Sequence, residues 1–171
     1  MVKNTLVGLV VSGLIIASAY ANKVIKLPNY AMKLSVETTA SKAKIWHLWE
    51  DVENWKDYDE RLEYSYLVDN APFETGAVGY VKGKGAPKSK FVLTKVIKEE
   101  SFTEVLQLPL WQSIHLQRYF EESQNDNTVF THEVQFKGGM KSVFYWLLAG
   151  PFKKDLQKVM TEMKTLAEKP E

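Results

Sequence analysis

The stretch M140-K-S-V-F-Y-W-L-L-A-G-P-F-K-K-D-L-Q-K-V-M-T-E-M-K-T-L-A-E168 decides the fold, because it supplies the only large apolar helix face in the sequence. Apolar residues recur in it at helical spacing and lysines fall on the other side, which predicts one long helix over 140–168. The apolar stripe consists of Val143, Trp146, Leu147, Gly150, Leu156, Val159, Met160, Met163 and Leu166. Pro151 lies inside this helix and is expected to kink or split it near Ala149 and Gly150.

Six strand-like runs precede this helix, and short polar turns separate them. They span residues 62–68, 79–82, 90–97, 102–108, 113–120 and 128–136. Because no helical pattern interrupts them, they indicate an antiparallel meander. The Gly- and Lys-rich segment 82–88 is expected to be a flexible connection at the mouth of a cavity.

The first folded elements lie between residues 32 and 61. Residues 32–37 alternate apolar and polar side chains as a strand does, and Ser41 can cap the helix that follows. That helix carries a stripe of Ile45, Leu48, Trp49 and Val52. Asn54 can cap a second short helix through Tyr58.

This order of elements predicts an α+β fold in which a curved antiparallel sheet wraps around the long C-terminal helix. A sheet of this size must bury one face, and the 140–168 helix is the large apolar partner available to it. A twisted sheet and a single helix do not close tightly at both ends, so we expect a pocket between them.

The composition limits the classes of function. The chain has 171 residues with 45% hydrophobic and 25% charged residues, which favours one globular domain. Lys+Arg number 22 and Asp+Glu 21, without a basic block, so nucleic acid is not an expected partner. The sequence has no Cys, which excludes a thiol nucleophile, a Cys-ligated metal and a Cys-linked lipid.

The N-terminus resembles a secretory signal, with a Lys, an apolar run from Leu6 to Ala19 and the small-residue pattern Ala19-Tyr20-Ala21. We expect cleavage after Ala21; the alternative is that residues 1–21 remain as an N-terminal membrane anchor. Either outcome predicts an exported protein, periplasmic or secreted, or held at the membrane by that segment. Residues 22–31 are expected to be a linker, followed by a domain over 32–168.

The element order and several short motifs resemble the START-like helix-grip superfamily, also called SRPBCC, which includes polyketide cyclase/dehydrase and lipid-transport-like domains. The motifs are A43-K-I-W46, D51-V-E-N-W55, F91-V-L-T94, T131-H-E-V-Q-F-K-G138 and L147-L-A-G-P-F152. The resemblance implies a hydrophobic cavity for lipids, sterols, polyketides or other apolar small molecules. It transfers no catalytic residues, because these differ among its branches.

Polar side chains on predicted inward strand faces are the candidate site residues. Alternation places His132 on the apolar face of its strand, Arg118 on that of the preceding strand, and Glu104 with Phe102 and Leu106. Arg118 and His132 together could bind an anionic head group or serve acid–base chemistry, and a buried Glu104 could act as an acid or a base. The simpler interpretation, which we favour for Arg118, is a solvent-exposed pair with Glu121, Glu122 or Glu133; for Glu104 a place at the rim explains the pattern equally well.

Aromatic residues are the other candidate ligand contacts. Trp46 and Trp49 are expected to be core anchors, whereas Trp55 and Tyr58 are expected to cover the cavity mouth; the alternative is that all four are core residues that contact no ligand. Further lining candidates are Tyr80, Phe91 and Trp146, together with Tyr64 and Tyr66. The acids between residues 50 and 60 are interpreted as a solvated face, and His47 as a surface residue.

Three functional hypotheses remain. The first is a domain that binds an apolar or amphipathic small molecule without a cofactor or a metal. The second is a cyclase/dehydratase-type enzyme that uses His132, Arg118 or Glu104 for proton transfer. The third is an adaptor that binds another protein.

Overall fold

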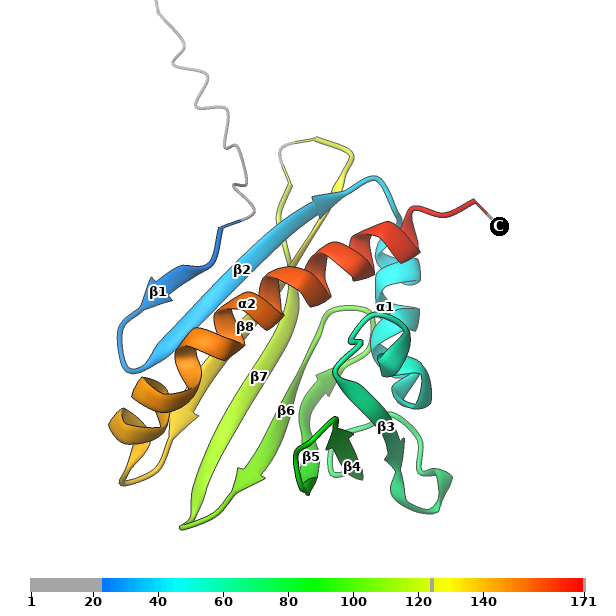
Figure 1. The fold of residues 1–171 in the computed structure, drawn as a ribbon. Coiled ribbons are helices and arrows are strands. Elements are labelled where there is room, and N and C mark those ends of the chain that lie inside the picture. The colour runs from blue at the N-terminus through cyan, green and yellow to red at the C-terminus, as the bar shows by residue number, and fades with distance from the viewer. Residues whose placement is uncertain (1–22, 124, 171) are drawn as a thin grey trace, which may run out of the picture.

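The computed structural model describes residues 23–123 and 125–170 (Figure 1). The predicted signal or anchor, residues 1–21, lies outside these described residues. Eight strands form one antiparallel sheet in the order β1-β2-β8-β7-β6-β5-β4-β3. The strands are β1 Ile25–Leu27, β2 Ala31–Thr38, β3 Leu62–Leu67, β4 Val78–Gly83, β5 Lys88–Ile97, β6 Ser101–Leu108, β7 Gln112–Glu121 and β8 Thr128–Lys137.

The chain order explains this topology. Strands β3 to β7 each pair with the next strand along the chain, as the short polar turns predict. The early strand β2 then pairs with the last strand β8, with Leu34 opposite His132. Strands β2 and β3, which flank the two helices in the sequence, are therefore not neighbours in the sheet.

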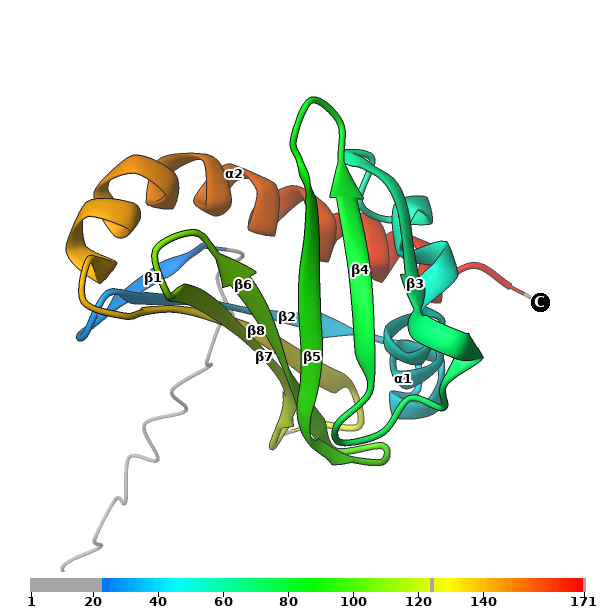
Figure 2. The same ribbon diagram turned by 90° about the horizontal axis from the view of Figure 1, so that it is seen from below.

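Two longer helices pack against this sheet, α1 Lys42–Glu50 and α2 Lys141–Ala167. The Ser41 side chain accepts a hydrogen bond from the backbone N–H of Lys44 and caps α1, as its position predicts. The second short helix is a 3-10 helix, η1 Val52–Asp57, and another 3-10 turn, η2, spans Val68–Asn70. Figure 2 shows α2 lying across the concave side of the curved sheet.

The predicted fold class is confirmed, a curved antiparallel sheet around a long C-terminal helix. Two details differ. The segment predicted as a linker contains β1, which pairs with β2 and extends the sheet by one strand. Helix α2 is continuous through Pro151, so it is not split there.

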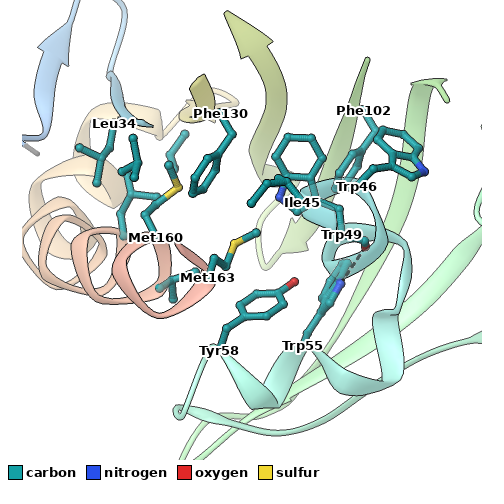
Figure 3. Close-up of a cluster of buried hydrophobic side chains, with 14 of the residues drawn as sticks. Leu34, Ile45, Trp46, Trp49, Trp55, Tyr58, Phe102, Phe130, Met160 and Met163 are labelled. Atoms are coloured by element: carbon teal, nitrogen blue, oxygen red, sulfur yellow. Dashed lines mark hydrogen bonds between the residues drawn. The ribbon is translucent and has the colours of Figure 1, made fainter. Parts of the chain in front are cut away.

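The core lies between α1, η1, the second half of α2 and the inner face of the sheet (Figure 3). Trp49 is completely buried, and its ring lies 4.8 Å from that of Phe120 and 5.8 Å from that of Phe102. Trp46 is also buried, with its ring 5.9 Å from Phe73. Both tryptophans are therefore core anchors, as predicted.

The two halves of α2 differ in burial. Between Leu156 and Ala167 the helix buries Leu156, Val159, Met160, Met163 and Ala167. Residues 141–155 include no buried side chain, although this half is about as apolar as the other. The predicted burial of Val143, Trp146 and Leu147 is therefore wrong, since these side chains are 45%, 80% and 54% exposed. In residues 23–123 and 125–170, no helix is long and apolar enough to cross a bilayer.

Candidate functional site

A pocket of about 330 Å³ opens between α2 and the inner face of strands β3 to β7, and we call it the inner pocket. Its apolar walls come from Leu62, Val81, Leu106, Leu116, Phe152 and Val159. Trp55 and Tyr58 of the η1 region add aromatic surface, and Glu104 and Arg118 add charge. The volume is near the lower end of the roughly 300–1,000 Å³ typical of small-molecule sites.

Glu104 and Arg118 form a buried ion pair in this pocket. Glu104 Oε2 lies 3.2 Å from Arg118 Nη2, and the two side chains are only 6% and 8% exposed. Glu104 of β6 and Arg118 of β7 are diagonal neighbours on adjacent strands, since the register pairs Glu104 with Leu116 and Arg118 with Phe102. Burial raises the pKa of Glu104, and the adjacent Arg118 guanidinium opposes that rise.

The solvent-exposed pairing that we favoured for Arg118 is wrong. Strand β7 continues to Glu121, so Arg118 lies inside the strand rather than at its end. Glu121 points to the opposite face, where it accepts hydrogen bonds from Lys33, Ser35 and Thr131. Strand alternation therefore sends Arg118 inward to Glu104, and Glu104 is buried rather than at a rim.

The Arg118 guanidinium lies between aromatic rings and is only partly hydrogen-bonded. Its Cζ is 5.0 Å from the centre of the Trp55 ring and 5.1 Å from that of Phe102. Its Nε and Nη1 are buried without a hydrogen-bond partner. Buried donors of this kind carry a desolvation cost, which an oxygen acceptor on a bound molecule would remove.

His132 points inward, as alternation predicts, but it does not line the inner pocket. Its Nε2 accepts a hydrogen bond of 3.2 Å from Trp49 Nε1, so the ring proton is assigned to Nδ1. Burial, together with the nearby Arg118 charge, lowers the pKa of His132 well below its ordinary value. We therefore assign His132 as a neutral residue that orients Trp49.

Trp55 and Tyr58 are buried wall residues rather than exposed covers of the mouth. Trp55 Nε1 donates a 2.9 Å hydrogen bond to the carbonyl oxygen of Trp49, and Tyr58 Oη donates one of 3.2 Å to that of Leu48. Burial raises the pKa of Tyr58. Phe91 stacks behind Trp55 with ring centres 5.5 Å apart and supports that wall.

None of the five further lining candidates, Tyr64, Tyr66, Tyr80, Phe91 and Trp146, lines the inner pocket. Val81 lines the pocket, so its strand neighbour Tyr80 faces the opposite side of β4. There the Tyr80 ring lies 5.7 Å from that of Tyr66 and 4.2 Å from Lys88 Nζ. Trp146 is 80% exposed and borders a separate groove between β1 and α2.

Charged side chains around the mouth connect the η1–β3 segment to α2. Arg61 pairs with Asp59 at 2.8 Å and also with Asp155, while Glu60 pairs with Lys158. The acids of this segment are therefore partly paired with cations rather than simply solvated.

The predicted Gly–Lys loop also lines the pocket, with Gly83, Lys84, Ala86 and Pro87. That loop therefore lies where it was expected.

Several lining residues were not identified from the sequence. Leu106 was placed on an inward strand face, and Leu116 shares a strand face with Arg118, so the same alternation could have included both. Phe152 and Val159 depend on how α2 crosses the sheet, which helical periodicity does not specify. Within the described ranges, no group of three or more His, Asp or Glu side chains is arranged to hold a metal ion.

Comparison with known proteins gives structural similarity without sequence similarity. No protein-family model and no curated protein matches the sequence. Among solved structures, a START superfamily protein from Mycobacterium smegmatis aligns with a TM-score of 0.59 at 13% identity, over 80% of this chain and 97% of that one. Protein Ms6760, also from M. smegmatis, aligns with a TM-score of 0.62 at 13% identity, over 87% and 98% of the two chains.

A biosynthetic protein gives a similar alignment. The di-domain ARO/CYC protein StfQ of the steffimycin biosynthetic pathway has a TM-score of 0.64 at 9% identity. The alignment covers 87% of this chain and 52% of StfQ, so the chain spans about half of that protein. The TM-scores show a common fold, but at identities this low they show nothing more, so function has to be argued from the site itself.

Proposed function

We propose that this chain, which has the START-like helix-grip fold, binds an apolar small molecule in the inner pocket and recognises a neutral oxygen acceptor on it. The observation that carries the proposal is Arg118, a pocket-lining guanidinium with two buried nitrogens that lack a hydrogen-bond partner. Suitable ligands are ketones, esters or alcohols with a lipid-like or polyketide-like skeleton.

The apolar walls supply most of the binding free energy in this proposal. Burying apolar ligand surface contributes roughly 25 cal/mol per Å² before the cost of association. The aromatic wall formed by Trp55 is held in place by its hydrogen bond to Trp49 and by Phe91 behind it. A pre-formed wall of this kind reduces the entropy that the protein loses on binding.

The charge of the pocket favours a neutral acceptor over an anion. Glu104 already balances the charge of Arg118, at 3.2 Å. A carboxylate or phosphate ligand at Arg118 would place a second negative charge next to the buried Glu104, which is costly. A carbonyl or hydroxyl oxygen accepts a hydrogen bond from the guanidinium without that cost.

The candidate acid–base groups are held by protein partners, which supports binding rather than proton transfer. Glu104 pairs with Arg118, His132 accepts from Trp49, and Tyr58 donates to the Leu48 carbonyl. The enzyme hypothesis from the sequence therefore gains no specific support from these contacts.

Three naphthalene derivatives that differ in one group test the proposal by calorimetry. They are 2-ethylnaphthalene, 2-acetonaphthone and 2-naphthoate, which have no oxygen, a neutral carbonyl and a carboxylate. One hydrogen bond to a charged group contributes about 1.5–3 kcal/mol, so the ketone should bind roughly ten- to a hundredfold more tightly than the hydrocarbon. The carboxylate should bind more weakly than the ketone.

The control is the neutral-pair variant, which carries Glu104→Gln and Arg118→Met. Replacing both charges avoids leaving one of them buried alone. In this variant the ketone should lose its advantage over the hydrocarbon. Equal binding of ketone and hydrocarbon to the unaltered protein, or tightest binding of the carboxylate, contradicts the proposal.

We also propose that the protein is exported, from the signal-like pattern of residues 1–21. The sequence favours cleavage after Ala21, so N-terminal sequencing of the protein from the cell envelope should begin at Asn22. A protein that begins at Met1 in the membrane fraction would support the retained anchor instead. A protein found only in the cytoplasm contradicts export.

A further inference from the structure

We propose that one end of the folded domain is a docking surface for an anionic lipid bilayer. This end consists of the β1–β2 turn, the β6–β7 turn and the first turns of α2, and we call it the apolar end. The proposal concerns a different part of the molecule from the inner pocket and does not depend on what that pocket binds.

Large apolar side chains are exposed at the apolar end. Trp111 is 95% exposed and Trp146 80% exposed. Leu110, Leu147, Val143, Met140 and Tyr30 add further exposed apolar surface. A groove of about 590 Å³ between β1 and α2 opens beside Trp146 and is lined by Val24, Met32, Tyr145 and Ala149 among others. Exposed apolar groups gathered in this way are typical of interaction sites.

Side-chain contacts hold the three segments together. Gln112 donates to the Leu110 carbonyl oxygen at 2.8 Å, and its Oε1 accepts from the backbone N–H of Met140 at 2.9 Å. The rings of Tyr30 and Tyr145 lie 5.8 Å apart, edge to face. In Figure 1, β1 and the beginning of α2 lie at one end of the molecule, with α1 and β3 toward the other. The segments that carry the exposed side chains therefore lie at the same end of the molecule.

The β6–β7 turn is occupied by residues that its backbone does not favour. Leu110 and Trp111 have φ values of 59° and 55°, and the Gln112 N–H donates to the Pro109 carbonyl oxygen across the turn. Turns with two central residues at positive φ favour Asn and Gly, because bulky side chains crowd the backbone there. Neither Leu nor Trp is needed to form this turn, whereas an external apolar partner gives both a function.

The charge around this surface identifies the partner as an anionic bilayer. Residues 23–32, 107–117 and 137–154 contain no Asp or Glu, and they contain Lys23, Lys26, Lys137, Lys141, Lys153 and Lys154. All six lysines are exposed. Lysines are attracted to anionic headgroups, and Trp favours the interface between headgroups and acyl chains. Two copies of this basic surface would repel each other, which disfavours a dimer through this end.

The position of the N-terminal apolar run agrees with this orientation. The run ends at Ala19, and the described fold begins at Lys23 next to β1. Four residue steps span at most about 14 Å, so a retained anchor would hold β1 and the adjacent groove close to the bilayer. If the run is cleaved, the apolar end is the part of the domain that would keep it on the membrane.

Tryptophan quenching tests the proposal on the full chain. Brominated acyl chains quench indole fluorescence on contact, and Trp46, Trp49 and Trp55 are shielded in the core at no more than 3% exposure. We expect quenching on vesicles of phosphatidylcholine with phosphatidylglycerol. The apparent affinity should be at least about tenfold weaker on phosphatidylcholine alone, and weaker at high salt.

The decisive variant is Leu110→Asn with Trp111→Gly, because Asn-Gly suits the turn and should leave the fold at least as stable. It should weaken the apparent affinity for the mixed vesicles by at least about tenfold, read from the quenching of Trp146. Its binding of 2-acetonaphthone should be unchanged, which separates this test from that of the inner pocket.

Other outcomes overturn the proposal. These are no quenching of the unaltered protein, or the same vesicle affinity in the variant as in the unaltered protein. A third is a dimer in analytical ultracentrifugation without lipid that the variant abolishes, which would identify a second copy as the partner.

Discussion

The two halves of α2 have similar hydrophobic character in the sequence and opposite positions in the structure. The second half places Met160 and Met163 fully inside the core, between the sheet and η1 (Figure 3). The first half leaves Trp146 and Leu147 in solvent. Phe144, Tyr145 and Phe152 of the first half still pack against the core, so its exposure is confined to the side that carries Val143, Trp146 and Leu147. The comparison teaches that the domain encloses the second half, whereas the first half packs on the domain with one side and leaves an apolar side available for an external contact.

The largest loss of unfolding free energy is expected from the buried ion pair Glu104–Arg118, which lies in the inner pocket beside α2. Glu104→Ala leaves Arg118 buried without a counter-charge, which should lower the free energy of unfolding by about 3–5 kcal/mol. Urea unfolding monitored by circular dichroism measures this change. The matched control is Glu63→Ala, which breaks an exposed pair with Lys82 and should cost less than about 1 kcal/mol. Similar losses for both variants would refute the assignment of a buried pair.

The next effect compares the halves of α2 directly. Met160→Ala removes a fully buried side chain and should cost about 2–5 kcal/mol through lost packing and a cavity. Trp146→Ala removes a larger side chain from the exposed half and should change the unfolding free energy by no more than about 0.5 kcal/mol. Unfolding midpoints in urea test both. A loss for Trp146→Ala comparable to that for Met160→Ala would show that the first half is part of the core.

A smaller change in the unfolding free energy is expected from pH, and the pKa of His132 gives its direction. The folded pKa of His132 lies well below its unfolded value, so the unfolded state binds the proton first as pH falls. The stability from a neutral His132 is present above about pH 6.5 and is lost progressively below it, by at most about 1.4 kcal/mol per pH unit. The folded pKa of Glu104 lies above its unfolded pKa, so the contribution of Glu104 to stability is instead lost as pH rises above the unfolded pKa.

Comparison with His132→Gln isolates the histidine contribution, because Gln keeps an acceptor for Trp49 and does not titrate. Unfolding free energies between pH 7.5 and 5 should fall more steeply for the unaltered protein than for this variant. The same slope for both proteins would argue that His132 does not titrate differently on unfolding. The other charged group facing His132 is Arg118, and it is the same in both proteins.

The smallest effect is expected at the mouth of the inner pocket. Asp155→Asn removes one partner of Arg61, which keeps Asp59 and is 44% exposed. The loss of unfolding free energy should be below about 1 kcal/mol and should shrink in high salt. Thermal unfolding at low and high salt measures it. A loss of several kcal/mol that is insensitive to salt would place this pair inside the core instead.

Strand alternation and helical period predicted much of this molecule. Alternation placed Glu104 and His132 inward because a two-residue period fixes the face of each side chain. It could not show that Glu104 and Arg118 meet, because that depends on the register between β6 and β7. The period of α2 likewise indicated a common face for Trp146 and Met160, but it contains no information on where the sheet beneath the helix ends.

The most direct test of the central claim is the carbonyl stretching frequency of bound 2-acetonaphthone, measured by infrared difference spectroscopy with a ¹³C-labelled carbonyl. If Arg118 donates to the ligand oxygen, the band should lie at lower wavenumber in the unaltered protein than in the neutral-pair variant. The same frequency in both proteins, with the ketone bound in both, would contradict recognition of a neutral acceptor by Arg118.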